Sequence, residues 1–244
     1  MKLSSLFRKI AFSLGINNQR KIYKLLSLKL YNSKSSLDKP FYSYSQFGED
    51  SVIRKYLPEN FGLYIDVGSG NPIRGNNTYA YYKLGWKGIL IDPISQNQIL
   101  GKKLRQKDYI ILAIVALENI NLVNFFEFTP YEYSTMSRIR YNHLMKEGKN
   151  FVKSYKVKSL SLASLGVKMT PNYPSFLSID AEGADLEVLK SNDFEFFRPR
   201  VICIEDLGFK RKGISDIQAF FRKRGMNLKI SPGQAIFMLL PSDC

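Results

Sequence analysis

The chain of 244 residues has little cysteine and almost no histidine. Cys203 lies inside an apolar run and Cys244 is the last residue, so the sequence predicts no disulfide framework and is typical of a reducing cytoplasm. His143 is the single histidine, and every mechanism that needs an imidazole depends on it. No apolar run approaches the roughly 18 residues that span a bilayer, and residues 1–15 lack the pattern of a signal peptide. The sequence therefore indicates a cytoplasmic protein.

Acidic residues are also scarce, because 21 Asp and Glu face 36 Lys and Arg, for a formal net charge of +15. Residues 1–40 hold nine Lys or Arg and a single acid, Asp38. We expect residues 1–40 to form a basic amphipathic helical extension and a linker, with residues 1–30 on an anionic membrane surface at its cytoplasmic side. The alternative is a helix packed on the domain with its charges in water. The apolar positions with helical spacing are Leu3, Leu6, Phe7, Ile10, Ala11 and Leu14.

Residues 41–244 alternate between strand-like and helix-like stretches, which predicts an α/β domain with parallel strands. We expect a mostly parallel seven-stranded sheet with an antiparallel last strand. An extra strand over 121–128 and an insertion over about 121–150 interrupt the alternation, and insertions at this position commonly contact substrate. The predicted strands are 63–67, 88–92, 109–115, 175–180, 200–205, 226–230 and 235–240, and the predicted helices are 48–57, 76–84, 94–105, 183–190 and 214–224.

A short apolar strand, LYIDVGSG, ends in Asp66, Gly68 and Gly70. Glycines in such a turn permit positive φ and close approach of a nucleotide-like ligand. The third glycine of the dinucleotide fingerprint is replaced by Ile73, which leaves the shorter pattern of S-adenosylmethionine (SAM) methyltransferases. Asp92 ends the next strand, where a carboxylate can bind ribose hydroxyls. The alternative is a strand-to-helix turn without a ligand.

Three further segments give this turn, DVGSGNP at 66–72, a context: SQFGED at 45–50, GWKG at 85–88 and IDAEG at 179–183. Their order and combination resemble the FkbM family of SAM-dependent methyltransferases over residues 44–206. The resemblance implies a Rossmann-like class I methyltransferase fold with SAM as cofactor. It also implies O-methylation, frequently of a sugar hydroxyl.

The resemblance also implies roles for single residues. The glycine turn would hold the amino-acid end of SAM, and Asp92 would hold its ribose hydroxyls. The alternative for Glu49 and Asp50 is that their charges complement a helix N-terminus. The alternative for Asn77 and Thr78 is that they are simple helix caps. The predicted cofactor-binding residues are Gln46, Glu49, Asp66, Gly68, Ser69, Gly70, Asn71, Thr78, Asp92 and Pro93.

Methyl transfer to a hydroxyl needs a group that accepts the proton. Asp180 and Glu182 follow the fourth long strand and are the natural candidates, unless they only cap the next helix. His143 is a third candidate, since imidazole titrates in the right range; the alternative is a solvated loop histidine. Glu205 and Asp206 end the following strand, and with Asp180 they could share a divalent ion such as Mg²⁺. Acidic strand ends also occur without a metal, so no metal site is assigned.

Arg138, Arg140 and Tyr141 in the insertion are predicted substrate contacts, with a solvated surface as the alternative.

The whole pattern predicts a SAM-dependent O-methyltransferase acting on a sugar hydroxyl of a surface glycan or its lipid-linked precursor. The alternatives are an RNA methyltransferase, an enzyme for a small metabolite, an NAD dehydrogenase and a non-catalytic membrane-surface domain. The missing third glycine disfavours the dehydrogenase. An absent Asn/Asp-Pro-Pro-aromatic element after residue 180 makes nucleic acid a less favoured partner.

Deletion of residues 1–30 tests the membrane prediction. The full chain is expected to co-sediment with anionic liposomes because of its basic amphipathic segment, and the deleted chain is expected to stay in the supernatant. Neutral liposomes are the control. A full chain that never binds anionic liposomes would contradict the prediction.

Overall fold

The computed structural model describes residues 42–119, 122–167, 173–206, 214–224, 227–230 and 235–238. The predicted helical extension over residues 1–40 lies outside these described residues. Within them, no helix is both long and apolar enough to cross a membrane.

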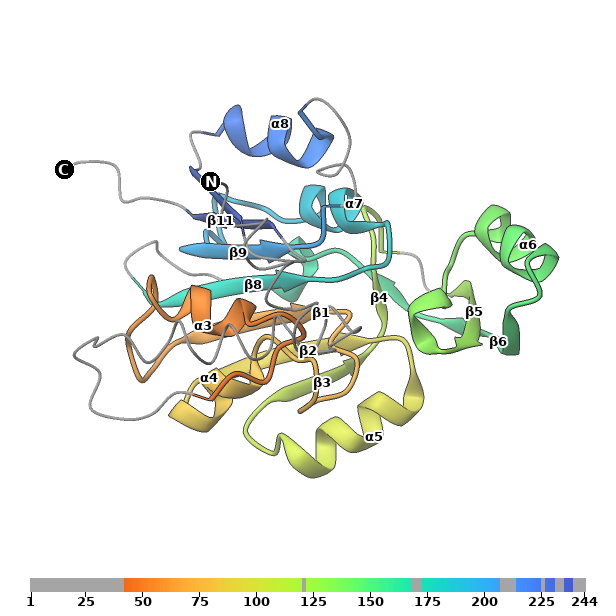
Figure 1. Cartoon of the computed structure of the whole chain (residues 1–244), viewed down its shortest axis with the longest axis horizontal. Helices are drawn as coiled ribbons and strands as arrows, with labels where there is room; N and C mark the ends of the chain where they lie inside the picture. Colours follow the sequence, from red (N-terminus) through yellow and green to blue (C-terminus); the bar gives the residue numbers. More distant parts are fainter. Residues whose placement is uncertain are drawn as a thin grey trace, which may run out of the picture.

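A sheet runs through the centre of the molecule in the order β10-β11-β9-β8-β1-β2-β3 (Figure 1). Its five strands from β3 to β9 are all parallel, which confirms the predicted mixed α/β architecture around a parallel sheet. The backbone of β11 pairs antiparallel with both β9 and β10. The strands are β1 (Leu63–Val67), β2 (Lys87–Asp92), β3 (Tyr109–Leu112), β8 (Ser175–Ile179), β9 (Val201–Ile204), β10 (Asn227–Ile230) and β11 (Ala235–Met238).

Helices cover both faces of this sheet, because its strands are apolar on both sides. Successive residues of a strand point to opposite faces, so Tyr64 packs in one hydrophobic cluster and Ile65 in the other. The Tyr64 side holds α3, α4 and α5, and the Ile65 side holds α7 and α8. In Figure 1, α8 lies at the top of the picture near the β11 end of the sheet, and α5 at the bottom near β3. The helices are α3 (Glu49–Ile53), α4 (Tyr79–Leu84), α5 (Ser95–Leu104), α7 (Asp185–Lys190) and α8 (Asp216–Arg222).

One predicted strand, 109–115, is divided in the structure. The chain leaves the central sheet after Leu112, and β4 (Ile114–Val115) pairs with β7 (Ser159–Leu160) instead. A continuous apolar run cannot reveal such a change of partner, because all its residues after the exposed Tyr109 are buried or half-buried. The prediction of a single strand was wrong for this reason.

The insertion forms a two-stranded arm that projects from one side of the sheet (Figure 1). Here "the arm" means residues 123–157: β5 (Val123–Thr129), the 3₁₀ turn η1 (Tyr131–Tyr133), α6 (Arg138–Lys146) and β6 (Asn150–Val157). β5 agrees with the extra strand expected over 121–128. β6 was not predicted, because most of its residues are exposed and it lacks the clear alternation of a half-buried strand.

Arg105 is fully buried just after α5, between this helix and the sheet. Its guanidinium is 2.7 Å from the Asp108 carboxylate, and both side chains are inaccessible to solvent. It also donates to the Tyr64 hydroxyl at 2.8 Å and to the Thr78 hydroxyl at 3.0 Å. One cation thereby joins β1, the start of α4 and the loop before β3. A buried charge is tolerated only when it is paired and hydrogen-bonded in this way.

Arg105→Leu is expected to lower the free energy of unfolding by about 3–5 kcal/mol, because it leaves a buried carboxylate without its counter-charge. Urea denaturation of the purified protein measures the change. Lys103→Leu, at an exposed position of the same helix, is the matched control and is expected to have little effect. Equal stability of the Arg105 variant and the control would contradict this account.

Candidate active site

The glycine turn after β1 touches the loop after β8. Gly68 has φ +70°, and a Cβ atom built there would lie 1.9 Å from the carbonyl oxygen of Asp180. The Asp180 amide donates to the carbonyl of Val67 at 3.0 Å. Only glycine fits at this position, because any side chain would clash with backbone. The turn and the acidic loop therefore form one continuous site at the carboxyl edge of the sheet, where open α/β sheets bind ligands.

Asp92 fixes the same turn from the side of β2. Its Oδ2 accepts from the Gly70 amide at 2.8 Å, and its Oδ1 accepts from the Ile94 amide and from Asn97 Nδ2. The side chain is buried, and burial raises the pKa of Asp92 to about 6. Asp92 thus orders the glycine turn, a role that the sequence did not indicate. Its contact with ribose stays a prediction.

Asp66 is equally enclosed by protein. Its Oδ2 accepts from Asn76 Nδ2 at 2.9 Å and from the Thr78 hydroxyl at 2.8 Å, next to Arg105. Burial raises the pKa of Asp66, while Thr78 and Arg105 act in the opposite direction. Thr78 is the N-cap residue of α4 but makes no side-chain capping bond, so its reading as a simple cap was wrong. Asn77 also reaches away from the helix, and its Nδ2 donates to Ser178 Oγ at 3.1 Å.

The loop after β8 carries the most crowded acids of the site. Burial, together with the negative charges of Glu205 and Glu182, raises the pKa of Asp180 well above its usual range. Burial and Glu205 also raise the pKa of Glu182 to about 7. Glu182 has φ +51°, a left-handed conformation that is uncommon outside glycine and often marks functional sites. The raised pKa values make both carboxylates stronger bases, as a group that accepts a proton requires.

The arm reaches this loop through Arg140. Its Nη1 donates to the carbonyl of Glu182 at 2.8 Å, and its Nη2 lies 3.8 Å from the Glu182 carboxylate. Arg138 and Tyr141, the other two predicted substrate contacts, pack against other residues of the arm instead, with Arg138 exposed and Tyr141 half-buried. Tyr141 stacks on Phe126 with ring centroids 4.4 Å apart, and the Arg138 guanidinium lies over both rings. Of the three, only Arg140 is brought to the strand ends.

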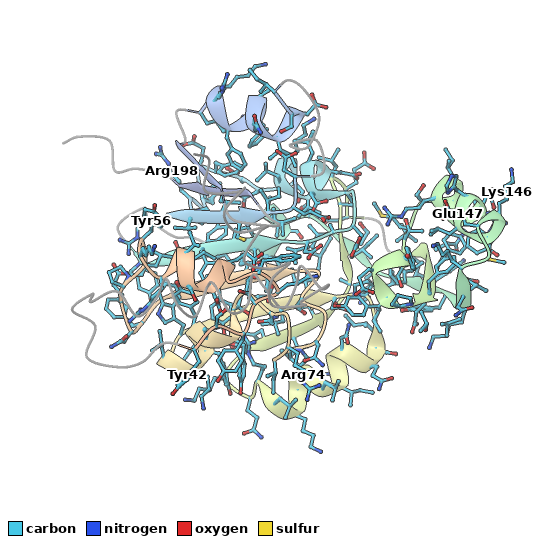
Figure 2. All side chains as sticks on the ribbon, viewed as in Figure 1. Tyr42, Tyr56, Arg74, Lys146, Glu147 and Arg198 are labelled. Carbon is cyan, nitrogen blue, oxygen red and sulfur yellow. The ribbon has the colours of Figure 1, made fainter. Side chains whose placement is uncertain are left out.

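His143 has a partner on its own helix rather than at the strand ends. Its side chain is 70% exposed, and its Nδ1 is 3.5 Å from Glu147. Figure 2 shows Lys146 and Glu147 at the outer end of the arm. The structure therefore does not bring the histidine together with Asp180 and Glu182.

The segment before β1 pairs with the loop that follows the glycine turn, through a bridge between Ser45 and Gly75. Glu49 is buried at the start of α3; its Oε2 accepts from the Phe47 amide, and its Oε1 has no hydrogen-bond partner in the described part of the chain. Burial raises the pKa of Glu49 to about 7. Asp50 instead anchors the preceding loop, since it accepts from the hydroxyls of Ser43 and Ser45. Gln46 is exposed in this loop.

The remaining predicted cofactor residues mostly shape loops. Asn71 Oδ1 accepts from the amides of Ile73 and Arg74 within the turn. Ser69 is buried, and its carbonyl accepts from Asn76 Nδ2. The carbonyl of Pro93 accepts from the hydroxyl of Tyr155, at 2.9 Å, which gives the arm a second attachment to the body.

No metal site is evident in the described ranges, where no group of three or more His, Cys, Asp or Glu residues is arranged to hold an ion. Asp206, one of the acids considered for Mg²⁺, accepts a hydrogen bond from Ser215 Oγ at 2.6 Å, next to the start of α8. The geometry therefore gives no support to the divalent-ion hypothesis.

Sequence reasoning missed Tyr131 of η1. Its hydroxyl is 3.4 Å from the position that a Cβ would take at Gly70. Burial raises its pKa to about 12, with contributions from the negative charges of Glu132, Asp180 and Asp92, so the ring lies among the acids of the site. Its position directly after Pro130 in an insertion was the one available signal in the sequence.

Glu49→Gln is expected to make stability less dependent on pH. Since the pKa of Glu49 is raised from 4.5 to about 7 on folding, its contribution to stability is complete below pH 4.5 and is lost as the pH rises through 7. From about pH 5 to about pH 8, the wild type should lose up to about 3 kcal/mol more than the variant. Urea denaturation across this range measures it, with Glu195→Gln, at an exposed position, as control. Parallel pH profiles would contradict the raised pKa.

Comparison with known families agrees with this geometry. The methyltransferase FkbM domain matches residues 66–228, about two thirds of the chain. The match begins at Asp66 and includes the glycine turn, the arm and the acidic loop after β8. No curated protein matches the chain significantly. With its parallel sheet and this match, the chain belongs to the FkbM family of methyltransferases.

Proposed function

We propose that the chain is a SAM-dependent O-methyltransferase that acts on a sugar hydroxyl in a surface glycan or its lipid-linked precursor. The observation that carries the proposal is the contact between the glycine turn and the acidic loop after β8. A donor held at Gly70 and an acceptor held at Asp180 would be neighbours, as in-line transfer requires.

The turn has the features of a ligand cradle. Gly70 has φ +55°, its amide is fixed by Asp92, and its missing side chain leaves backbone open to close approach. SAM bound there would supply an electrophilic methyl group on a positively charged sulfur. Buried Glu49, with one oxygen unpartnered in the described residues, is our candidate for the amino end of the donor. The other proposed donor contacts are Gln46, Asp66, Gly68, Ser69, Asn71, Thr78, Asp92 and Pro93.

We assign the role of proton acceptor to Asp180, with Glu182 as its neighbour. A carboxylate is a weak base at its ordinary pKa, and the raised pKa of Asp180 makes it a stronger base. Glu182, held by Arg140, would orient the sugar by accepting hydrogen bonds from other hydroxyls.

The sign of the charge at the site favours a neutral acceptor over RNA. Asp180, Glu182 and Glu205 repel one another, and they would also repel a phosphate near the reacting hydroxyl. The net charge of +15 alone does not outweigh this, because a basic surface attracts many partners without selecting one. We further propose that residues 1–30 hold the enzyme at the cytoplasmic face of a membrane, where lipid-linked acceptors lie.

Incubation of the enzyme with SAM and a glycan pool is expected to add one methyl group to a sugar, detected by mass spectrometry. Asp180→Asn should lower the turnover by about 100-fold or more, because it removes the proton acceptor. It should leave binding of S-adenosylhomocysteine (SAH) within a few-fold of the wild type.

Glu195→Gln, at an exposed position outside the site, is the control and should retain activity. Calorimetry that detects no SAH binding to the wild type would exclude the proposed enzyme. Methylation of RNA but not of glycans would leave the donor assignment in place and overturn the acceptor.

A further inference from the structure

Tyr131 overhangs the glycine turn from the arm. Its hydroxyl lies 3.4 Å, and two of its ring carbons lie 3.7 Å, from the position of a Cβ at Gly70. The ring therefore borders the space that the absent side chain leaves open. A ligand that approaches the Gly70 backbone must contact this ring or displace it.

The surroundings of Tyr131 are strongly negative. Glu132, Asp180, Asp92 and Glu182 all lie close enough to disfavour ionisation of its hydroxyl. The phenol therefore stays neutral, and its ring presents a face with partial negative charge. A positive charge placed between this ring and the carboxylates would be stabilised by both.

The arm does not need Tyr131 to stay attached to the body. Arg140 binds the carbonyl of Glu182, and Tyr155 binds the carbonyl of Pro93. Tyr131 is also 48% exposed, unlike Phe126 and Phe128 in the interior of the arm. A purely structural role does not explain why a partly exposed ring lies over the glycine turn.

We propose that Tyr131 recognises the positive charge of the methyl donor: its ring contacts the sulfonium end of SAM, and so favours the charged donor over SAH, its neutral product. The inference rests on the proposed function. It adds a residue that distinguishes donor from product, and it ties donor binding to the arm that also holds Glu182 through Arg140.

The test compares SAM with SAH, which differ in the methyl group and the charge on sulfur. Isothermal titration calorimetry gives the two dissociation constants without an acceptor and therefore without turnover. Tyr131→Leu, which removes the aromatic face at similar bulk, should weaken SAM binding by about 3- to 10-fold and SAH binding by less than about twofold. Tyr131→Phe keeps the aromatic face and should keep the wild-type ratio.

Tyr109→Leu is the control, since Tyr109 is the exposed first residue of β3. Thermal unfolding should show that the Tyr131 variants fold. Equal weakening of SAM and SAH by Tyr131→Leu, or no weakening, would overturn the inference and leave the proposed function standing, as would loss of the SAM preference in Tyr131→Phe. A wild type that binds neither compound would instead refute the proposed function and the inference with it.

Discussion

A single buried cation, Arg105, is the constraint on which the donor side of the site depends. It pairs with Asp108 and donates to the hydroxyls of Tyr64 and Thr78, while its guanidinium lies over the rings of three tyrosines. Through Thr78 the network continues to Asp66, the acid that begins the glycine turn. The turn is therefore held in shape by side chains behind it. Preorganisation of this kind lowers the entropic cost of ordering a loop when a ligand binds.

At the loop after β8, where the acceptor would bind, like charges are gathered instead of opposite ones. Burial and the negative charge of Glu205 raise the pKa values of Asp180 and Glu182, so the unliganded site stores unfavourable electrostatic energy. Arg140 offsets part of it and draws the arm onto the loop after β8. A positively charged donor would offset more of this electrostatic energy, which is a physical reason for an acidic site in a basic protein. The positive charge of the chain as a whole is carried elsewhere, with a large share in residues 1–40.

Several candidate site residues were predicted from the sequence, but their partners were not. Asp66 and Asp92 were selected for a ligand, whereas the structure shows that each also binds the backbone or side chains of its own loops. Arg140 was grouped with Arg138 because the two are close in sequence, yet residues two apart on a helix face different directions. Tyr131 went unnoticed because its importance lies in its approach to Gly70, some sixty positions earlier in the chain.

The sequence by itself determined the parallel α/β sheet, the glycine turn and the family, because strand periodicity, Asp66-x-Gly68-x-Gly70 and the IDAEG segment are local patterns. Only the tertiary structure decided which side chains meet: that Arg105 lies behind the turn, that Gly68 touches Asp180, and that His143 faces Glu147. It also decided that the arm continues through β6. The physical reason is that local patterns fix the backbone of a segment, whereas buried charges and close contacts depend on what other segments bring to the same place.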